Sequence, residues 1–157
     1  MGDNILDKLD EIDMKLISLL QSNARSSVKD LAKELFLSSP AVSSRIERLE
    51  KMKVITGYTA KVDLKKLGYN ITAFINLKLP PGEKESFYPF IKKFPNVIEC
   101  NHITGNYSML IKAVFRSTTE LDSFVGKLQH FGHTQTQIVL STPVPPRGVG
   151  TIKREDE

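Results

Sequence analysis

The sequence of 157 residues lacks several features that whole classes of protein need. It has one cysteine, Cys100, so no disulfide can form within the chain. No apolar run approaches the roughly 20 residues that cross a bilayer as a helix. The acidic start, MGDNILDKLDEID, has no apolar signal-peptide core. These absences argue against export and against a membrane partner, and we expect a cytoplasmic protein.

Catalytic and metal-binding motifs are missing as well. No glycine loop between a strand and a helix fits a phosphate cradle, and no nucleophile elbow occurs. His130 and His133 stand three residues apart in HFGH, but no third ligand lies near them. Cys100 alternates with apolar neighbours, as a core residue does. The sequence therefore predicts no enzyme, no cofactor and no metal site.

The charge that is present is unevenly distributed, although the net charge is only +4. Residues 1–23 hold two lysines against five acidic residues, whereas residues 24–61 hold eight basic residues against four acidic ones. An excess of positive charge permits an anionic partner near the second segment. An ordinary solvated face would carry the same excess.

Three amphipathic helices are predicted in this part of the chain from apolar residues spaced three and four apart. Ser27 caps the second helix, and Ser38 or Ser39 caps the third, with Pro40 in its first turn. A short helix, a short connection and another helix form a helix-turn-helix. The residues predicted to face inward are Leu9, Ile12, Leu16, Leu19, Leu20, Val28, Leu31, Ala32, Leu35, Val42, Ile46 and Leu49.

The third helix carries small polar and cationic residues on the side turned away from Val42 and Ile46. Small residues would let the helix enter a major groove, where arginine can bond guanine. Lysines at its end suit phosphate contacts. A helical hairpin packed on its own domain is the alternative. The predicted DNA-binding residues are Ser39, Ala41, Ser43, Ser44, Arg45, Arg48, Lys51 and Lys53.

The segment VITGYTAKVD, which follows the third helix, has the composition of a strand. It predicts either a wing or an exit strand that pairs with another chain. Residues 1–62 then form the DNA-binding domain. Residues 63–70 form a hinge in which Asp63 caps one turn that Gly68 ends.

Residues 71–142 read as a ferredoxin-like domain with the element order β-α-β-β-α-β, so the fold class is α+β. Alternation predicts strands at ITAFINLKL, NVIECNHIT, SMLIKAVF and TQTQIVL, and helices lie between them at KESFYPFIKKF and STTELDSFVGKLQHF. Pro89 is expected to delay the first of these helices. Residues 143–157 are expected to be irregular.

The strands of this domain are apolar on both sides. Met109 and Ile111 alternate with Leu110 and Val114, and Phe74 lies opposite the row of Ile71 and Ile75. Two helices cover only one face of a four-stranded sheet, and a large apolar face is rarely left in water. The sequence therefore predicts a homodimer.

The run LDEIDMKLISLLQSNARSSVKDLAKELFLSSPAVSSRIERLEKMKVITGYTA resembles the DNA-binding half of the leucine-responsive regulatory protein/AsnC family, the feast/famine regulators. RIERLE followed by VITGYTA is its most specific part, and the resemblance spans roughly Ile5 to Leu140. It implies transcription regulation, double-stranded DNA as partner, and dimers joined through the sheet domains. Assembly into octamers is often part of the same pattern.

The resemblance also implies an effector site. Family members that sense amino acids have a GDYD-like turn between the second and third strands. GNYS stands here instead, and Asn106 and Ser108 bring no charge to an ammonium group. An amino acid, a different ligand or no ligand are the alternatives. The implied effector residues are Gly105, Asn106, Tyr107, Ser108, Thr134 and Thr136.

Two other functions compete with a DNA-binding regulator that responds to a small molecule. One is an architectural DNA-binding protein without an effector, and the other is a sensor that acts through partner proteins. DNA affinity that falls steeply with rising salt separates a DNA-binding protein from such a sensor.

Overall fold

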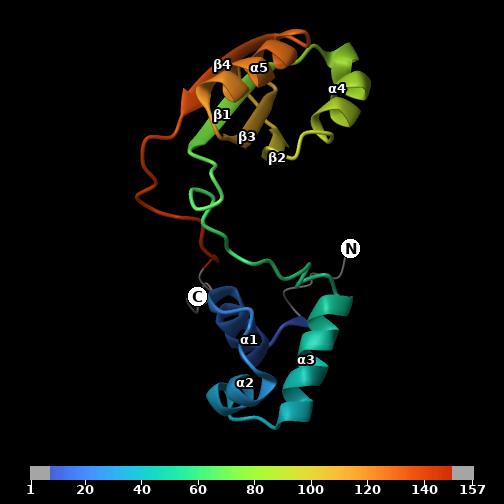
Figure 1. The fold of residues 1–157 in the computed structure, drawn as a ribbon. Coiled ribbons are helices and arrows are strands. Elements are labelled where there is room, and N and C mark those ends of the chain that lie inside the picture. The colour runs from blue at the N-terminus through green and yellow to red at the C-terminus, as the bar shows by residue number, and fades with distance from the viewer. Residues whose placement is uncertain (1–7, 150–157) are drawn as a thin grey trace. The chain divides into compact units, whose positions relative to one another are not determined.

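The computed structural model describes residues 8–149 (Figure 1). The described residues form two compact units, one of residues 8–61 with 144–149 and one of residues 62–143. We call them the helix unit and the sheet unit. No helix in the described residues is long and apolar enough to cross a membrane. Residue 5, where the family resemblance begins, and residues 150–157 of the predicted tail lie outside the described part.

The helix unit contains the predicted helices, which begin where polar side chains cap them. Asp10 and Asp13 form a capping box at the start of α1 (Glu11–Ser22). Ser27 caps α2 (Val28–Leu35), and Ser38 caps α3 (Ser39–Lys51) with its Oγ 3.4 Å from the amide of Ala41. Only three residues separate α2 from α3, so the predicted helix-turn-helix is confirmed.

A small apolar core holds these helices together, mostly through the residues that the sequence pattern predicted. The apolar rows of all three helices contribute to it, and Val54 and Ile55 pack against its edge. The buried members are Leu16, Leu20, Leu31, Ala32, Leu35, Val42 and Leu49.

The predicted wing is absent from the described residues of this unit. The amides of Val54 and Ile55 both donate to Leu49 O at the end of α3, so they terminate the helix instead of starting a strand. Residues 56–62 are exposed and have no regular structure. The hydroxyl of Tyr58 donates to Glu50 of α3 at 2.8 Å, which brings this segment back to the helix. Pairing with another chain stays a prediction.

The sheet unit has the predicted order β-α-β-β-α-β, with strands arranged β2-β3-β1-β4 and every neighbouring pair antiparallel (Figure 1). The predicted ferredoxin-like fold is therefore confirmed. Pro89 lies inside α4 and does not delay its start. The elements are β1 (Ile71–Lys78), a short 3-10 helix η2 (Pro81–Glu83), α4 (Lys84–Ile91), β2 (Val97–His102), β3 (Met109–Phe115), α5 (Thr118–Gln129) and β4 (His133–Ile138).

Both helices pack on one face of the sheet, where the core is rich in phenylalanine. Phe87 of α4 is fully buried, and its ring meets Phe131 edge-on with centroids 5.4 Å apart. Phe94 and Phe115 each contact Phe124 of α5. These rings fix both helices against β1 and β3.

The other face of the sheet is less apolar than the sequence suggested. Phe74 and Leu110 lie on it partly exposed, but Val114 is only 4% exposed. Polar side chains alternate with them, because Phe74 pairs with Lys112 and Leu110 with Asn76. The ammonium of Lys112 lies 5.7 Å from the centre of the Phe74 ring. The apolar area left for a partner is therefore smaller than predicted.

The segments that join and follow the units are short of regular structure. Asp63 accepts the amide of Lys65, and a turn runs over residues 64–68. The role of residues 63–70 as a hinge stays a prediction. Residues 141–149 are irregular and exposed. Gly148 lies against α1, since a Cβ added to it would be 2.8 Å from the side chain of Gln21.

Candidate nucleic-acid interface and effector site

One side of α3 is turned to the core and the other to solvent. Val42 and Leu49 are buried, and Ile46 packs partly against them. On the opposite side the predicted DNA-binding residues Ser39, Ser44, Lys51 and Lys53 are exposed, and Ala41 and Ser43 are partly exposed. The solvent side therefore has small side chains near the start of the helix, and Glu47, Arg48 and the lysines toward its end.

Arg45 and Arg48, also predicted to bind DNA, are hydrogen-bonded within the helix unit. Nη1 of Arg45 donates to both carboxylate oxygens of Asp10, at 2.9 and 2.7 Å, and to Oδ1 of Asp13 at 2.8 Å. Nη2 of Arg48 donates to Oδ2 of Asp13. The two arginines thus join α3 to the start of α1.

The physical reason for this arrangement is the burial of Asp13, whose side chain is 0% exposed. A buried carboxylate is costly unless it is paired and hydrogen-bonded. Burial by itself would raise the pKa of Asp13, but the backbone amide of Asp10 and the guanidinium groups of Arg48 and Arg45 outweigh it and lower that pKa. Hydrogen bonds to Asp10 and Asp13 raise the pKa of Arg45. We call Asp10, Asp13, Arg45 and Arg48 the acid-arginine cluster.

The cluster was missed in the sequence, although a signal for it was present. Asp13 lies four residues after Leu9 and three before Leu16, which places it within the apolar row of α1. A carboxylate in an apolar row needs a cationic partner nearby. The two arginines of the serine-rich helix could have been recognised as such cationic partners.

Lys53 lies just beyond α3 in a left-handed conformation with φ of 58°. Its amide donates to Glu50 O, and that of Val54 to Leu49 O, so the turn closes the helix. The side chain of Lys53 is exposed. Lys51, two residues earlier at the end of α3, is exposed as well.

The candidate effector residues lie at one end of the sheet. The turn between β2 and β3 contains Gly105, whose φ of 110° suits glycine, and the exposed Asn106. Tyr107 stacks on His133 at the start of β4, with ring centroids 6.3 Å apart. Thr134 pairs with Leu77 of β1, beside this ring pair. The structure thus brings Tyr107 close to the beginning of β4.

The two remaining effector candidates are placed less favourably for one joint site. Ser108 Oγ accepts the amide of Leu79 at 2.9 Å and donates to a backbone carbonyl of β1 or of the residue after it. The hydroxyl therefore ties the turn to the end of β1. Thr136 pairs with Ile75, two residues further along β4 than Thr134, and is exposed.

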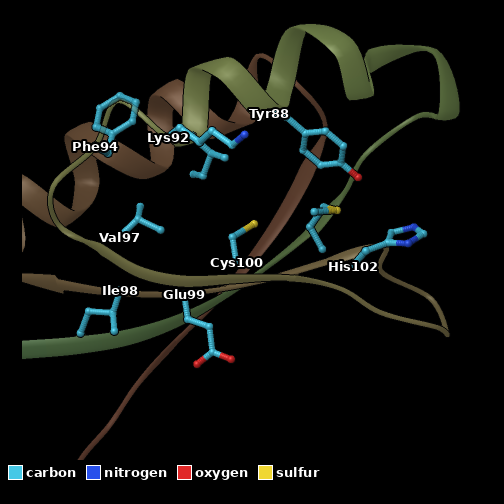
Figure 2. Close-up of a pocket in the computed structure, with 10 residues that line it drawn as sticks. Tyr88, Lys92, Phe94, Val97, Ile98, Glu99, Cys100 and His102 are labelled. Atoms are coloured by element: carbon cyan, nitrogen blue, oxygen red, sulfur yellow. The ribbon is translucent and has the colours of Figure 1, made fainter. Parts of the chain in front are cut away.

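A groove of about 450 Å³ lies elsewhere in this unit, between α4 and β2 (Figure 2). Val97 and Cys100 point toward α4, whereas Ile98 and Glu99 point to the opposite side (Figure 2). Burial raises the pKa of the Cys100 thiol. The groove contains none of the candidate effector residues. No cluster of three potential metal ligands occurs among residues 8–149.

Comparisons with known proteins match one family model to each unit, apart from residues 144–149, which belong to the helix unit but fall within the second match. The model of the AsnC-type helix-turn-helix domain matches residues 9–50, and that of the Lrp/AsnC ligand binding domain matches residues 72–149. The HTH-type transcriptional regulator FL11 of Pyrococcus furiosus is 35% identical over 135 residues, 84% of this chain and 89% of that protein. This chain belongs to the Lrp/AsnC family of transcription regulators.

Solved structures of the Lrp/AsnC family have the same fold. Bacillus subtilis LrpC matches with a TM-score of 0.83 at 29% identity, covering 88% of this chain and 99% of that one. The feast or famine regulatory protein of M. tuberculosis complexed with L-methionine matches with a TM-score of 0.84 at 26% identity, covering 90% and 99%. The chain is accordingly a helix-turn-helix transcription regulator and not an enzyme.

Proposed function

We propose that this Lrp/AsnC regulator reads double-stranded DNA by placing the exposed side of α3 in the major groove. The observation that carries this proposal is the set of small exposed or partly exposed residues in the first turns of α3, Ser39, Ala41, Ser43 and Ser44, with Pro40 as the other exposed residue of that stretch. Small side chains let the helix backbone approach the base edges. The exposed Lys51 and Lys53 beyond them can neutralise phosphates, which positions the helix without reading sequence.

The test uses DNA fragments selected with the wild-type protein from the genome of its source. Ser44→Glu adds bulk and a negative charge at the proposed contact, so we expect at least a tenfold loss of affinity for the selected fragment. Ser123→Glu is the matched control, because Ser123 is an exposed serine on α5 of the sheet unit. Equal affinity of the two variants would contradict the proposal.

Salt dependence tests the phosphate contacts separately. Lys51→Ala and Lys53→Ala should each reduce the slope of log affinity against log salt by about 1. Lys93→Ala, at an exposed position of the sheet unit, should leave the slope unchanged. Unchanged slopes in both α3 variants would remove these lysines from the interface.

We also propose that the active form is a homodimer joined through the open face of the sheet. Phe74 and Leu110, both partly exposed, and Ile98, which is 49% exposed, are apolar residues of this face that support it. Leu110→Asp should shift sedimentation toward the monomer, whereas Ser123→Asp should not. A normal assembly in the Leu110 variant would count against this interface. Wild-type sedimentation also separates a dimer from an octamer.

The effector that we propose is a small molecule recognised without a carboxylate partner for its amino group. L-methionine is present in complexes of two similar structures, from Neisseria meningitidis and M. tuberculosis. In this chain Asn106 and Ser108 are uncharged, and the Ser108 hydroxyl is bonded to backbone next to β1. Loss of the charged partner weakens ammonium recognition but leaves carboxylate recognition possible.

Calorimetric titration with L-methionine and with its 2-hydroxy analogue tests this effector class. We expect the hydroxy analogue to bind at least as tightly as the amino acid. The variant Asn106→Asp should reverse that order, because it restores a carboxylate in the turn. Tighter binding of L-methionine to the unmodified protein would overturn the proposal.

A further inference from the structure

The acid-arginine cluster divides its two arginines into different roles. The guanidinium of Arg45 is 24% exposed, and its Nη1 group serves three carboxylate oxygens of Asp10 and Asp13. The side chain of Arg48 is 44% exposed and is bonded to Asp13 through Nη2. Within the described part of the chain, Nη1 and Nε of Arg48 have no hydrogen-bond partner. Each arginine thus bonds through a single nitrogen, but Arg45 makes three bonds from it whereas Arg48 makes one and is the more exposed of the two.

Nη1 and Nε of Arg48 belong to the same side of α3 as the proposed interface. Side chains on a helix lean toward its N-terminus, so Arg48 extends toward the turn that contains Ser44. Ser44 is small and exposed, and leaves room for the guanidinium above it. A planar guanidinium bonded through Nη2 keeps Nη1 and Nε as donors and presents them over a restricted range of directions.

We propose that Asp13 is a positioning residue that sets the specificity of DNA recognition by orienting Arg48. This inference rests on the proposed docking of α3 in the major groove. Asp13 itself is fully buried and touches no DNA; it acts through Arg48. A pre-oriented side chain loses less conformational freedom on binding than a free one. Orientation of Arg48 therefore favours DNA sequences whose base edges place acceptors in the direction of its donors.

The proposal predicts opposite effects on selected and on unrelated DNA. Asp13→Asn keeps the shape of the side chain but releases Arg48 and removes one negative charge. Affinity for unrelated DNA should stay the same or rise, because a negative charge near the phosphates is gone. Affinity for the selected fragment should fall roughly two- to tenfold, because Arg48 must be ordered on binding. A merely structural loss would lower both affinities together.

Asp10→Asn is the matched control. Asp10 lies on the same helix cap and loses the same charge, but its carboxylate contacts Arg45 and not Arg48. It should leave the ratio of selected to unrelated binding unchanged. Both variants are measured as the full-length protein against the selected fragment and a scrambled duplex of equal length. A ratio that falls equally in both variants would overturn the proposal.

A double-mutant cycle shows whether Asp13 acts through Arg48. In the Arg48→Ala background, Asp13→Asn should not change the binding ratio further. A further loss of the same size as in the wild type would contradict the assignment. Where Asp13→Asn does not fold, Arg48→Lys takes its place, since it keeps the charge but not the planar fork. Its ratio should fall like that of Arg48→Ala, and an unchanged ratio would overturn the proposal.

Failure of this inference can be told apart from failure of the proposed interface. When α3 does not dock, Ser44→Glu has no effect on DNA affinity. When α3 docks but Asp13 has no positioning role, Ser44→Glu weakens binding while Asp13→Asn and Asp10→Asn give the same ratio.

Discussion

In the helix unit the side chain that ties α1 to α3 is a buried carboxylate, whereas in the sheet unit phenylalanine rings hold the helices to the strands. The helices of the first unit are short, at 8 to 13 residues, and enclose only a small apolar core. The second unit buries nearly twice as many apolar residues against its sheet. A small core leaves more of the stability to charge and capping.

This difference couples stability to function in one unit and separates them in the other. The arginines that compensate Asp13 lie on the helix proposed to read DNA, so a change of the interface there is also a change of the core. The turn from Gly105 to Ser108 and the threonines of β4 lie at the rim of the sheet, outside its buried cluster. Substitutions in the candidate effector site should therefore be tolerated better than substitutions in the cluster.

The largest effect is expected in the aromatic core. Phe87→Ala should lower the free energy of unfolding of the sheet unit by about 3–5 kcal/mol, because the ring is fully buried and a cavity remains. Hydrogen exchange with mass spectrometry reads the two units separately. Tyr88→Ala is the control, since its neighbouring ring is 37% exposed, and it should cost about 1 kcal/mol or less. Loss of protection in the helix unit as well would show that the units unfold together.

A backbone clash gives the next largest effect in the same unit. A Cβ on Gly132 would lie 2.2 Å from the carbonyl oxygen of Lys78, and its φ of 157° lies where other residues are rare. Gly132→Ala should destabilise the sheet unit by about 2–3 kcal/mol, because neither backbone can move freely. Gly126→Ala on α5 is the control, since its Cβ meets nothing within 4 Å, and alanine favours the helix there.

Acid distinguishes the two units without a mutation. The folded-state pKa of Asp13 lies below its ordinary value of 3.8, so its contribution to stability is present above that value. It is lost as the pH falls from about 3.8 through the lower folded-state pKa. Hydrogen exchange should show the helix unit opening first in this range, at a cost of about 2 kcal/mol for the broken charged hydrogen bonds. Asp13→Asn should remove most of this dependence, and earlier opening of the sheet unit would contradict the comparison.

How much of this molecule the sequence predicts depends on whether the deciding interaction is local. Serine caps and apolar spacing lie within one element, so the helices from Val28 and Ser39 and the strand from Ile71 were predicted well. The prediction of a wing was wrong because the amides of Val54 and Ile55 donate to the carbonyl oxygen of Leu49 in the preceding helix. Strand composition says nothing about which backbone group is still free.

The candidate site shows the same limit. Exposure of Ser44 and Lys51 follows from helical spacing, because the opposite side contains the apolar row. The direction of Arg45 depends on Asp10, 35 residues earlier in the chain, and spacing within α3 cannot reveal it. The role of Ser108 likewise depends on the backbone of Leu79, on another strand end. Hydrogen bonds between residues that are far apart in the sequence decide which donors and acceptors remain available on a surface, even where the exposure of its residues is predicted correctly.

The smallest effect concerns two residues of the helix unit that adopt a left-handed backbone without being glycine. Phe36, with φ of 55°, ends α2 and is 91% exposed, and Lys53 ends α3 with φ of 58°. This conformation costs a side-chain-bearing residue roughly 1–2 kcal/mol, and glycine avoids that cost. Phe36→Gly also loses the contact of its ring with the ammonium of Lys15, 5.9 Å away, worth about 0.5 kcal/mol. Glycine is also freer in the unfolded chain, which offsets about 0.5–1 kcal/mol of this relief. We therefore expect Lys53→Gly to stabilise the unit by about 0.5–1 kcal/mol in chemical denaturation, and Phe36→Gly to stabilise it by less.

The same pair of variants separates stability from DNA binding where the acid-arginine cluster joins them. Lys53→Gly should weaken binding to all DNA and reduce its salt dependence, because it removes a proposed phosphate contact. Phe36→Gly should leave the salt dependence unchanged, since it removes no charge. When both variants gain stability and only the lysine variant loses affinity, the coupling of fold and function in this unit is confined to the cluster. A loss of affinity in proportion to stability in both variants would extend that coupling to the whole helix unit.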